Sequence, residues 1–221
     1  MSASLYRVWD LPTRIFHWVV ALLVLAQWCS AEWNLLSMDW HFRFGYALLA
    51  LVLFRIVWGF VGSDSARFAR FLAGPSRVAG YAPTLARREP SAHAGHNPLG
   101  GWAVAAMLSV LLMQSVTGLF ANDDISLYGP LSERVSADTA GQLTSIHKSL
   151  TDVLVVLIGL HLTAVTWYSV WKRERLVPAM FTGRKALAAE PAVRFAGHGR
   201  ALLVFAACSG VVWAVVEFGS R

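Results

Sequence analysis

Apolar residues dominate five long stretches of this chain, and most polar residues lie between them. The stretches run near 15–33, 41–61, 99–120, 146–170 and 201–218. Each has about the length that a helix needs to cross a bilayer, roughly 17–25 mainly apolar residues. The pattern therefore predicts five membrane-spanning helices. The first is interpreted as a permanent span, because Glu32 and Trp33 follow it and not the small residues of a cleavage site.

The composition supports this interpretation. Of the 221 residues, 56% are hydrophobic and only 14% are charged, and the mean hydropathy is +0.51. Soluble domains contain about 25% charged residues, so an ordinary soluble domain is excluded. We expect an all-α integral membrane protein with a four-helix transmembrane domain over 1–171, a basic loop over 172–200 and a fifth transmembrane helix over 201–221.

Charge predicts the orientation of these helices. Most of the 19 basic residues lie in the N-terminal arm and in the connections 62–98 and 172–200. They are Arg7, Arg14, Arg67, Arg70, Arg77, Arg87, Arg88, Lys172, Arg173, Arg175, Arg184, Lys185, Arg194 and Arg200. The positive-inside rule places these segments and the N-terminus in the cytoplasm. The C-terminus is then periplasmic, in a bacterial inner membrane. The net charge of +6 is thus a topology signal, and it does not indicate nucleic-acid binding.

Four histidines fall at two depths of the predicted bundle. His147 and His161 are fourteen residues apart in the fourth span, so they share one helix face about 21 Å apart along the axis. His17 lies near the cytoplasmic start of the first span, and His41 lies near the outer start of the second. The topology therefore pairs His17 with His161 on the inner side and His41 with His147 on the outer side.

Two imidazoles at one depth can serve as the axial ligands of a haem iron. The alternatives are that the histidines only hydrogen-bond between helices, or that they bind zinc. Zinc prefers four ligands, and neither level offers a Cys, Asp or Glu at helical spacing to complete the set. Cys29 and Cys208 lie in apolar runs without a Cys-x-x-Cys-His motif, so they predict neither a disulfide framework nor covalently attached haem.

The chain also resembles a known family. The run VWDLPTRIFHW around His17, the motif His41-x-x-x-Gly45, the run GHNPLGG at 95–101 and the spacing of His147 and His161 resemble the prokaryotic cytochrome b561 family. The resemblance covers roughly 6–171. That family includes the b-type cytochrome subunits of nickel-iron hydrogenases, and its haem arrangement is similar to that of the membrane subunit of respiratory formate dehydrogenases. Membership would imply a four-helix bundle with two non-covalently held haems b. It would also imply electron transfer between membrane quinone and a partner redox protein.

The resemblance implies that the four histidines are the haem ligands, and haem propionates require basic partners near the membrane surfaces. Arg14 on the inner side, and Arg43 and Lys148 on the outer side, are placed for that role. Ordinary snorkelling of these side chains is the alternative. Arg55 lies two-thirds along the second span and is either functional or snorkelling.

Asn97 is the candidate quinone-binding residue, because its amide can donate to a quinone carbonyl and related membrane cytochromes use an asparagine at a similar place. The alternative is that Asn97 and Pro98 cap the third span as N-cap and first residue. The two roles are compatible.

The sequence leaves the partner open. Acidic residues of the outer loops (Glu32, Asp39, Asp123, Asp124, Glu133, Asp138) suit a basic partner such as a c-type cytochrome, and a hydrogenase or dehydrogenase subunit is the other choice. A stand-alone quinone-linked oxidoreductase acting on superoxide, and a haem-free scaffold or metal transporter, are the competing functions. The fifth span would pack on the bundle or on a partner, and a homo-oligomer stays open.

Overall fold

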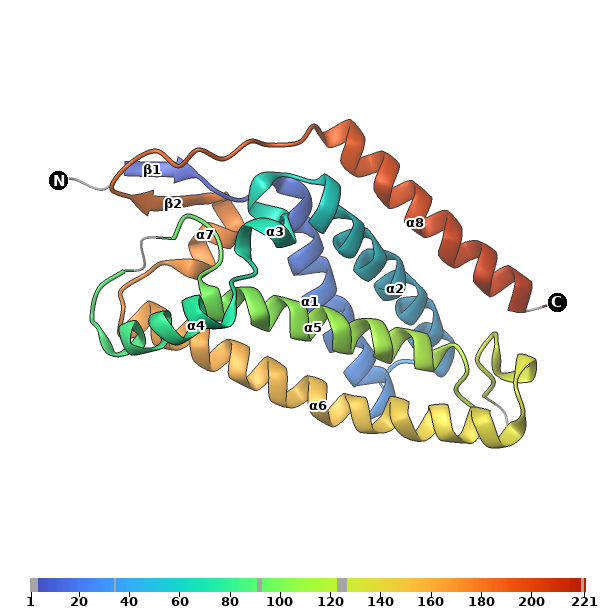
Figure 1. Cartoon of the computed structure of the whole chain (residues 1–221). Helices are drawn as coiled ribbons and strands as arrows, with labels where there is room; N and C mark the ends of the chain where they lie inside the picture. Colours follow the sequence, from blue (N-terminus) through green and yellow to red (C-terminus); the bar gives the residue numbers. More distant parts are fainter. Residues whose placement is uncertain (1–3, 34, 91–92, 123–126, 220) are drawn as a thin grey trace. The chain divides into compact units, whose positions relative to one another are not determined.

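A computed structural model describes residues 4–33, 35–90, 93–122, 127–219 and 221. Asp123 and Asp124 of the expected acidic loop lie outside these ranges. Within these described ranges, five helices are long and apolar enough to cross a membrane, as the sequence predicts (Figure 1). They are α1 (Leu11–Ala31), α2 (Met38–Val61), α5 (Pro98–Gly118), α6 (Ala137–Val170) and α8 (His198–Gly219).

Short elements lie in the connections between these helices. They are β1 (Ser4–Arg7), η1 (Asp64–Ala66), α3 (Phe68–Phe71), α4 (Pro75–Tyr81), η2 (Ala82–Ala86), η3 (Ser132–Arg134), α7 (Leu176–Thr182) and β2 (Arg184–Leu187). The expected basic loop 172–200 thus contains a helix and a strand. The described chain forms two compact units, and each long helix contributes to both. Unit 1 comprises Met1–Ile15, Val57–Met107 and Val156–Ala201, and unit 2 comprises Phe16–Ile56, Leu108–Val155 and Leu202–Arg221.

The helix α6 begins well before the apolar stretch that predicts it. Ser136 precedes its first residue, and the backbone N–H of Thr139 donates to the Ser136 hydroxyl oxygen at 3.2 Å. This is the bond of an N-cap. The additional first turns are polar, so a search for apolar residues alone misses them. Both His147 and His161 lie on α6, which is one continuous helix (Figure 1).

Unit 1 contains a two-stranded antiparallel sheet in which Ser4 of β1 faces Leu187 of β2. Its small core consists of Val8, Trp9, Ala179 and Leu187. Gly183 ends α7 with a φ of 76°, a left-handed conformation that glycine adopts without steric cost. Its carbonyl oxygen accepts hydrogen bonds from the N–H groups of Val8 and Trp9 at 2.8 and 3.1 Å. The start of the chain is therefore fixed to the end of α7.

Two buried carboxylates hold other parts of unit 1. Asp10 is only 1% exposed; its Oδ1 accepts the N–H of Thr13 at 3.0 Å and its Oδ2 accepts the indole N–H of Trp58 at 2.9 Å. Asp10 thus caps α1 and joins it to the end of α2. Glu174 pairs with Lys185 Nζ at 2.6 Å, and both side chains are buried. These pairs satisfy charges that would be costly to bury alone.

Unit 2 packs α8 against α2 within the same chain. Leu49 and Ala50 of α2 form a core with Leu119 and with Val212 of α8. The side chain of Arg134 donates to the carbonyl oxygen of Phe218 at 2.7 Å, at the end of α8. The fifth span therefore packs on this chain's own helices.

Candidate functional site

His41 and His147 lie next to each other in unit 2. Their ring centroids are 6.3 Å apart and their planes meet at 75°. A first-row metal ion binds an imidazole nitrogen at about 2.0–2.1 Å, so an ion between two such nitrogens holds the ring centres about 6 Å apart. The observed separation fits one metal ion between the two rings.

The hydrogen bonds of His147 distinguish its two ring nitrogens. Its Nδ1 lies 2.9 Å from the backbone carbonyl oxygen of Gln114, to which only a protonated nitrogen can donate. Thr117 also approaches Nδ1, at 3.3 Å, but its hydroxyl donates to Met113 O at 2.7 Å. We therefore assign the proton to Nδ1. Nε2 then keeps its lone pair, and it accepts the Gln114 side-chain amide at 3.3 Å.

The hydrogen bonds of His41 also hold its Nδ1 atom. This nitrogen lies 3.0 Å from the hydroxyl oxygen of Ser30. The Gln27 side-chain amide, oriented so that its oxygen accepts from Gly45 N at 3.2 Å, reaches the same nitrogen at 3.2 Å. Ser30 and Gln27 thus both contact Nδ1. Partners of this kind, which bind the second imidazole nitrogen, orient metal-ligating histidines and raise their basicity.

Gly118 allows His147 to take this position. A Cβ atom at residue 118 would lie 2.9 Å from His147 Cε1 and 3.2 Å from Nδ1. The ring therefore occupies space that any other residue would fill.

The donor set fits a haem iron better than zinc. Two neutral imidazoles supply both axial positions of a haem. Among the residues that the structure describes, no group of three or more His, Cys, Asp or Glu side chains could hold a metal ion. A protein-only tetrahedral zinc site therefore lacks ligands in this part of the chain.

The other two predicted ligands lie in different units. His17 lies on α1 in unit 2, where its ring meets Trp18 edge-on at 4.9 Å. His161 lies on α6 in unit 1 and is half-buried. Their pairing stays a prediction.

The basic candidates differ in environment. Arg14 donates to the carbonyl oxygens of Met180 and Phe181, so it caps the last turn of α7. Arg43 is exposed, with its guanidinium 5.2 Å from the Trp40 ring centroid, and Lys148 is exposed. Their roles toward haem propionates stay predictions. Arg55 is only 2% exposed; it is enclosed in protein, and the snorkelling interpretation of this residue is wrong.

Asn97 is the N-cap of α5, as one interpretation of the sequence predicts. Its Oδ1 accepts the N–H of Gly100 at 2.8 Å, and Pro98 is the first helical residue. Its Nδ2 donates to the phenol oxygen of Tyr168 at 2.8 Å, and the Tyr168 and Tyr81 oxygens are 2.6 Å apart. A quinone role for Asn97 stays a prediction.

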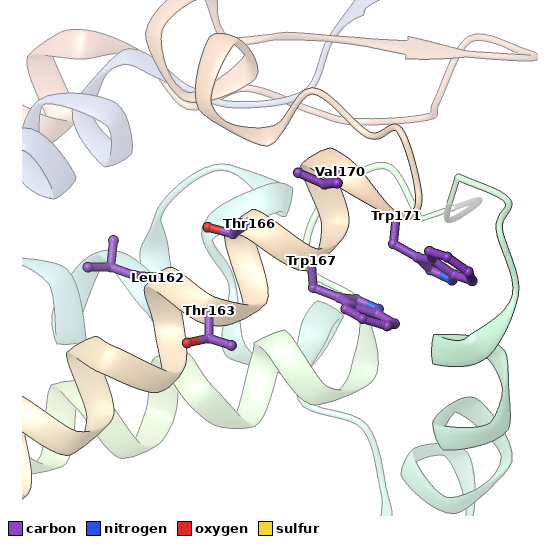
Figure 2. Close-up of a pocket in the computed structure, with 6 residues that line it drawn as sticks. All are labelled: Leu162, Thr163, Thr166, Trp167, Val170 and Trp171. Atoms are coloured by element: carbon purple, nitrogen blue, oxygen red, sulfur yellow. The ribbon is translucent and has the colours of Figure 1, made fainter.

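Sequence reasoning missed Ser30, Gln114, Tyr81 and Tyr168. One signal was present: Tyr168 follows His161 by seven residues, two turns, and therefore shares its helix face. The opposite face of α6 carries a shallow apolar groove of about 470 Å³, in which the rings of Trp167 and Trp171 lie side by side (Figure 2). The groove residues are Leu162, Thr163, Thr166, Trp167, Val170 and Trp171.

Comparison with known proteins identifies the family of the chain. The family described as prokaryotic cytochrome b561 matches residues 8–183. A protein of Rhizobium leguminosarum bv. viciae is named as a probable Ni/Fe-hydrogenase B-type cytochrome subunit. It is 25% identical to this chain, and the match covers 80% of this chain and 87% of that protein. No solved structure shows significant similarity to the chain. The chain belongs to the prokaryotic cytochrome b561 family and is a multi-pass membrane b-type cytochrome of electron transfer.

Proposed function

We propose that the protein holds two haems b in series and passes electrons between a membrane quinone and a partner redox protein. The arrangement of His41 and His147 carries this proposal. Their spacing of 6.3 Å between ring centroids and the partners that hold their Nδ1 atoms suit one haem. His17 and His161 are the proposed ligands of the other. Each haem, when bound, would supply one-electron chemistry, and the two histidines of each pair would hold its iron.

Residues around the two histidines would hold them in place for a haem. Ser30 and the Gln114 carbonyl orient the two imidazoles, and Gly118 leaves room for one of them. Arg14, Arg43 and Lys148 are the proposed partners of the haem propionates. Two histidines that both hold one iron would suit electron transfer.

The charge distribution supports a topology in a bacterial inner membrane. Most basic residues lie in the N-terminal arm and in the connections 62–98 and 172–200, and we place these segments in the cytoplasm together with the N-terminus. We place the C-terminus in the periplasm. The positive-inside rule is the basis of this assignment.

Asn97 is the proposed quinone-binding residue of unit 1. Its Oδ1 is used by the helix cap and one amide hydrogen by Tyr168. The second amide hydrogen has no protein acceptor among the described residues, and Asn97 is partly exposed. It can donate to a quinone carbonyl without loss of the cap.

The name of the Rhizobium relative supports a hydrogenase as the partner. A c-type cytochrome is the second candidate, because the periplasmic loops are acidic and would orient a basic protein. Binding to such a cytochrome should weaken as ionic strength rises.

Visible spectroscopy of the purified protein tests the proposal. We expect reduced-minus-oxidised bands of haem b and two haems per chain. His41→Ala and His147→Ala should each remove the same one haem, and His17→Ala and His161→Ala should remove the other. Absence of haem bands in the wild type would exclude the function, and loss of one common haem from all four variants would exclude the pairing.

A further inference from the structure

Three buried or half-buried side chains of unit 1 form an unbroken chain of hydrogen bonds. Asn97 Nδ2 donates to Tyr168 Oη at 2.8 Å, and Tyr168 Oη lies 2.6 Å from Tyr81 Oη. Tyr168 is 6% exposed and Tyr81 is 8% exposed. The Tyr–Tyr bond can run in either direction, since each phenol is both donor and acceptor.

The hydrogens on the two phenols determine how a proton can move along this hydrogen-bond chain. When Tyr81 donates, the Tyr168 oxygen accepts from both Tyr81 and Asn97, and both of its lone pairs are used. The hydrogen of Tyr168 then points to neither partner and is available to a third group. When the Tyr–Tyr bond reverses, Tyr168 donates to Tyr81, and the Tyr81 hydrogen is released instead. A proton can thus be passed along the pair.

The two ends of this hydrogen-bond chain lie in different surroundings. Tyr168 shares a face of α6 with His161, about 10 Å away along the helix axis. Tyr81 meets the ring of exposed His93 edge-on at 5.5 Å. The charged groups around the pair are Lys172, whose Nζ is 5.8 Å from the Tyr168 ring centroid, and the ion pair of Glu174 with Lys185. Burial raises the pKa of Tyr81, so its phenol carries a proton at neutral pH.

We propose that Tyr81 and Tyr168 conduct the protons of quinone reduction from the aqueous edge at His93 to the quinone at Asn97. This inference rests on the proposed quinone function. Reduction of one quinone to quinol takes two protons and two electrons, and the haems, when bound, would supply the electrons. For each proton, the Tyr168 O–H bond breaks as a quinone O–H bond forms. The Tyr168 oxygen takes the Tyr81 proton. A water molecule at the aqueous edge then gives a proton to the Tyr81 oxygen, and the hydroxide formed stays in the solvent.

Rapid mixing of the purified, pre-reduced holoprotein tests the relay. Haem reoxidation is followed in H₂O and D₂O, with a short-chain benzoquinone or with ferricyanide, which accepts electrons without protons. We expect Tyr168→Phe and Tyr81→Phe to slow the quinone reaction at least about tenfold, because general acid–base groups contribute about 10²–10⁴-fold. The ferricyanide reaction, haem content and visible spectrum should not change. Tyr6→Phe, which removes a phenol hydroxyl elsewhere in unit 1, is the matched control.

The outcomes separate the two proposals. A wild-type protein that quinone fails to reoxidise overturns the quinone function and the relay with it. If quinone reoxidises the wild type but D₂O has no effect on the rate, the relay alone is wrong, and no variant is needed to show it. The relay is equally wrong if both tyrosine variants match Tyr6→Phe, or if they slow ferricyanide as much as quinone, since the latter indicates damage to the haem sites.

Discussion

Replacing Gly118 with alanine should weaken haem binding at the proposed site of His41 and His147. The new Cβ atom would lie 2.9 Å from His147 Cε1, whereas ordinary van der Waals contacts begin near 3.4 Å. The His147 imidazole must therefore move by roughly 0.5 Å. This takes it away from the position in which its Nδ1 reaches Gln114 O at 2.9 Å. Overpacking of this kind costs about 1–3 kcal/mol.

The loss should appear mainly as weaker haem binding. Disturbing the partner that orients a metal-ligating histidine lowers affinity by about 10–100-fold, or about 1.4–2.7 kcal/mol. The helix itself would gain, since alanine is favoured over glycine by up to about 1 kcal/mol. A net loss of haem affinity in Gly118→Ala would therefore come from the contact of the new Cβ atom with the His147 ring.

Haem-to-protein ratios of purified variants measure the effect, with dilution or competition by apomyoglobin to compare affinities. Gly159→Ala is the matched control, because a Cβ atom at that position of α6 meets nothing within 4 Å. We expect Gly118→Ala to lose up to one haem per chain and Gly159→Ala to keep both. Equal haem retention in the two variants would refute the proposed role of Gly118.

Three further changes probe the hydrogen bonds and charges described above. Ser30→Ala removes the hydroxyl that contacts His41 Nδ1 and should lower affinity for the same haem about 10–100-fold, measured by haem competition; unchanged affinity would show that Ser30 does not orient His41. Trp58→Phe removes a donor to the buried Asp10 carboxylate and should destabilise the protein by about 1–3 kcal/mol, seen as a lower thermal midpoint. The matched control is Trp102→Phe, because the Trp102 indole is half exposed and donates to a neutral carbonyl. It should lower the thermal midpoint less, and an equal decrease would contradict this reasoning. His93 is exposed as a residue, but partial desolvation of its ring, and then the Lys185 ammonium, lowers its pKa. The unfolded chain therefore binds the proton first, and stability should fall as pH drops below about 6.5. His93→Gln should flatten that slope, and a slope unchanged by the substitution would exclude His93 as its cause.

The five spans could be predicted because each depends on local hydrophobicity alone. The N-cap role of Asn97 was equally local, since Asn followed by Pro favours a helix start. The polar beginning of α6 was not predictable in this way, because Ser136 and the turns after it look like loop. Element boundaries are set by caps as much as by apolar residues.

The partners of the site residues could not be predicted because they depend on tertiary packing. Gln114 and Ser30 lie far from His147 and His41 in the sequence or on other helices, and no spacing links them. Arg14 was expected only as a haem partner, yet it binds carbonyls of α7 that are more than 160 residues away. The pairing of β1 with β2 joins two four-residue strands, which are too short for periodicity to identify.

The bond between β1 and β2 also sets an order of events during synthesis. Residues 4–7 leave the ribosome about 180 residues before their partners in β2, a delay of roughly 10–40 s at 5–20 residues per second. During that interval α1 can insert, but the strand before it has no edge to pair with, and the carbonyl of Gly183 that holds Val8 and Trp9 does not yet exist. The N-terminal arm is therefore among the last parts of unit 1 to reach its final position, although it is the first to be made.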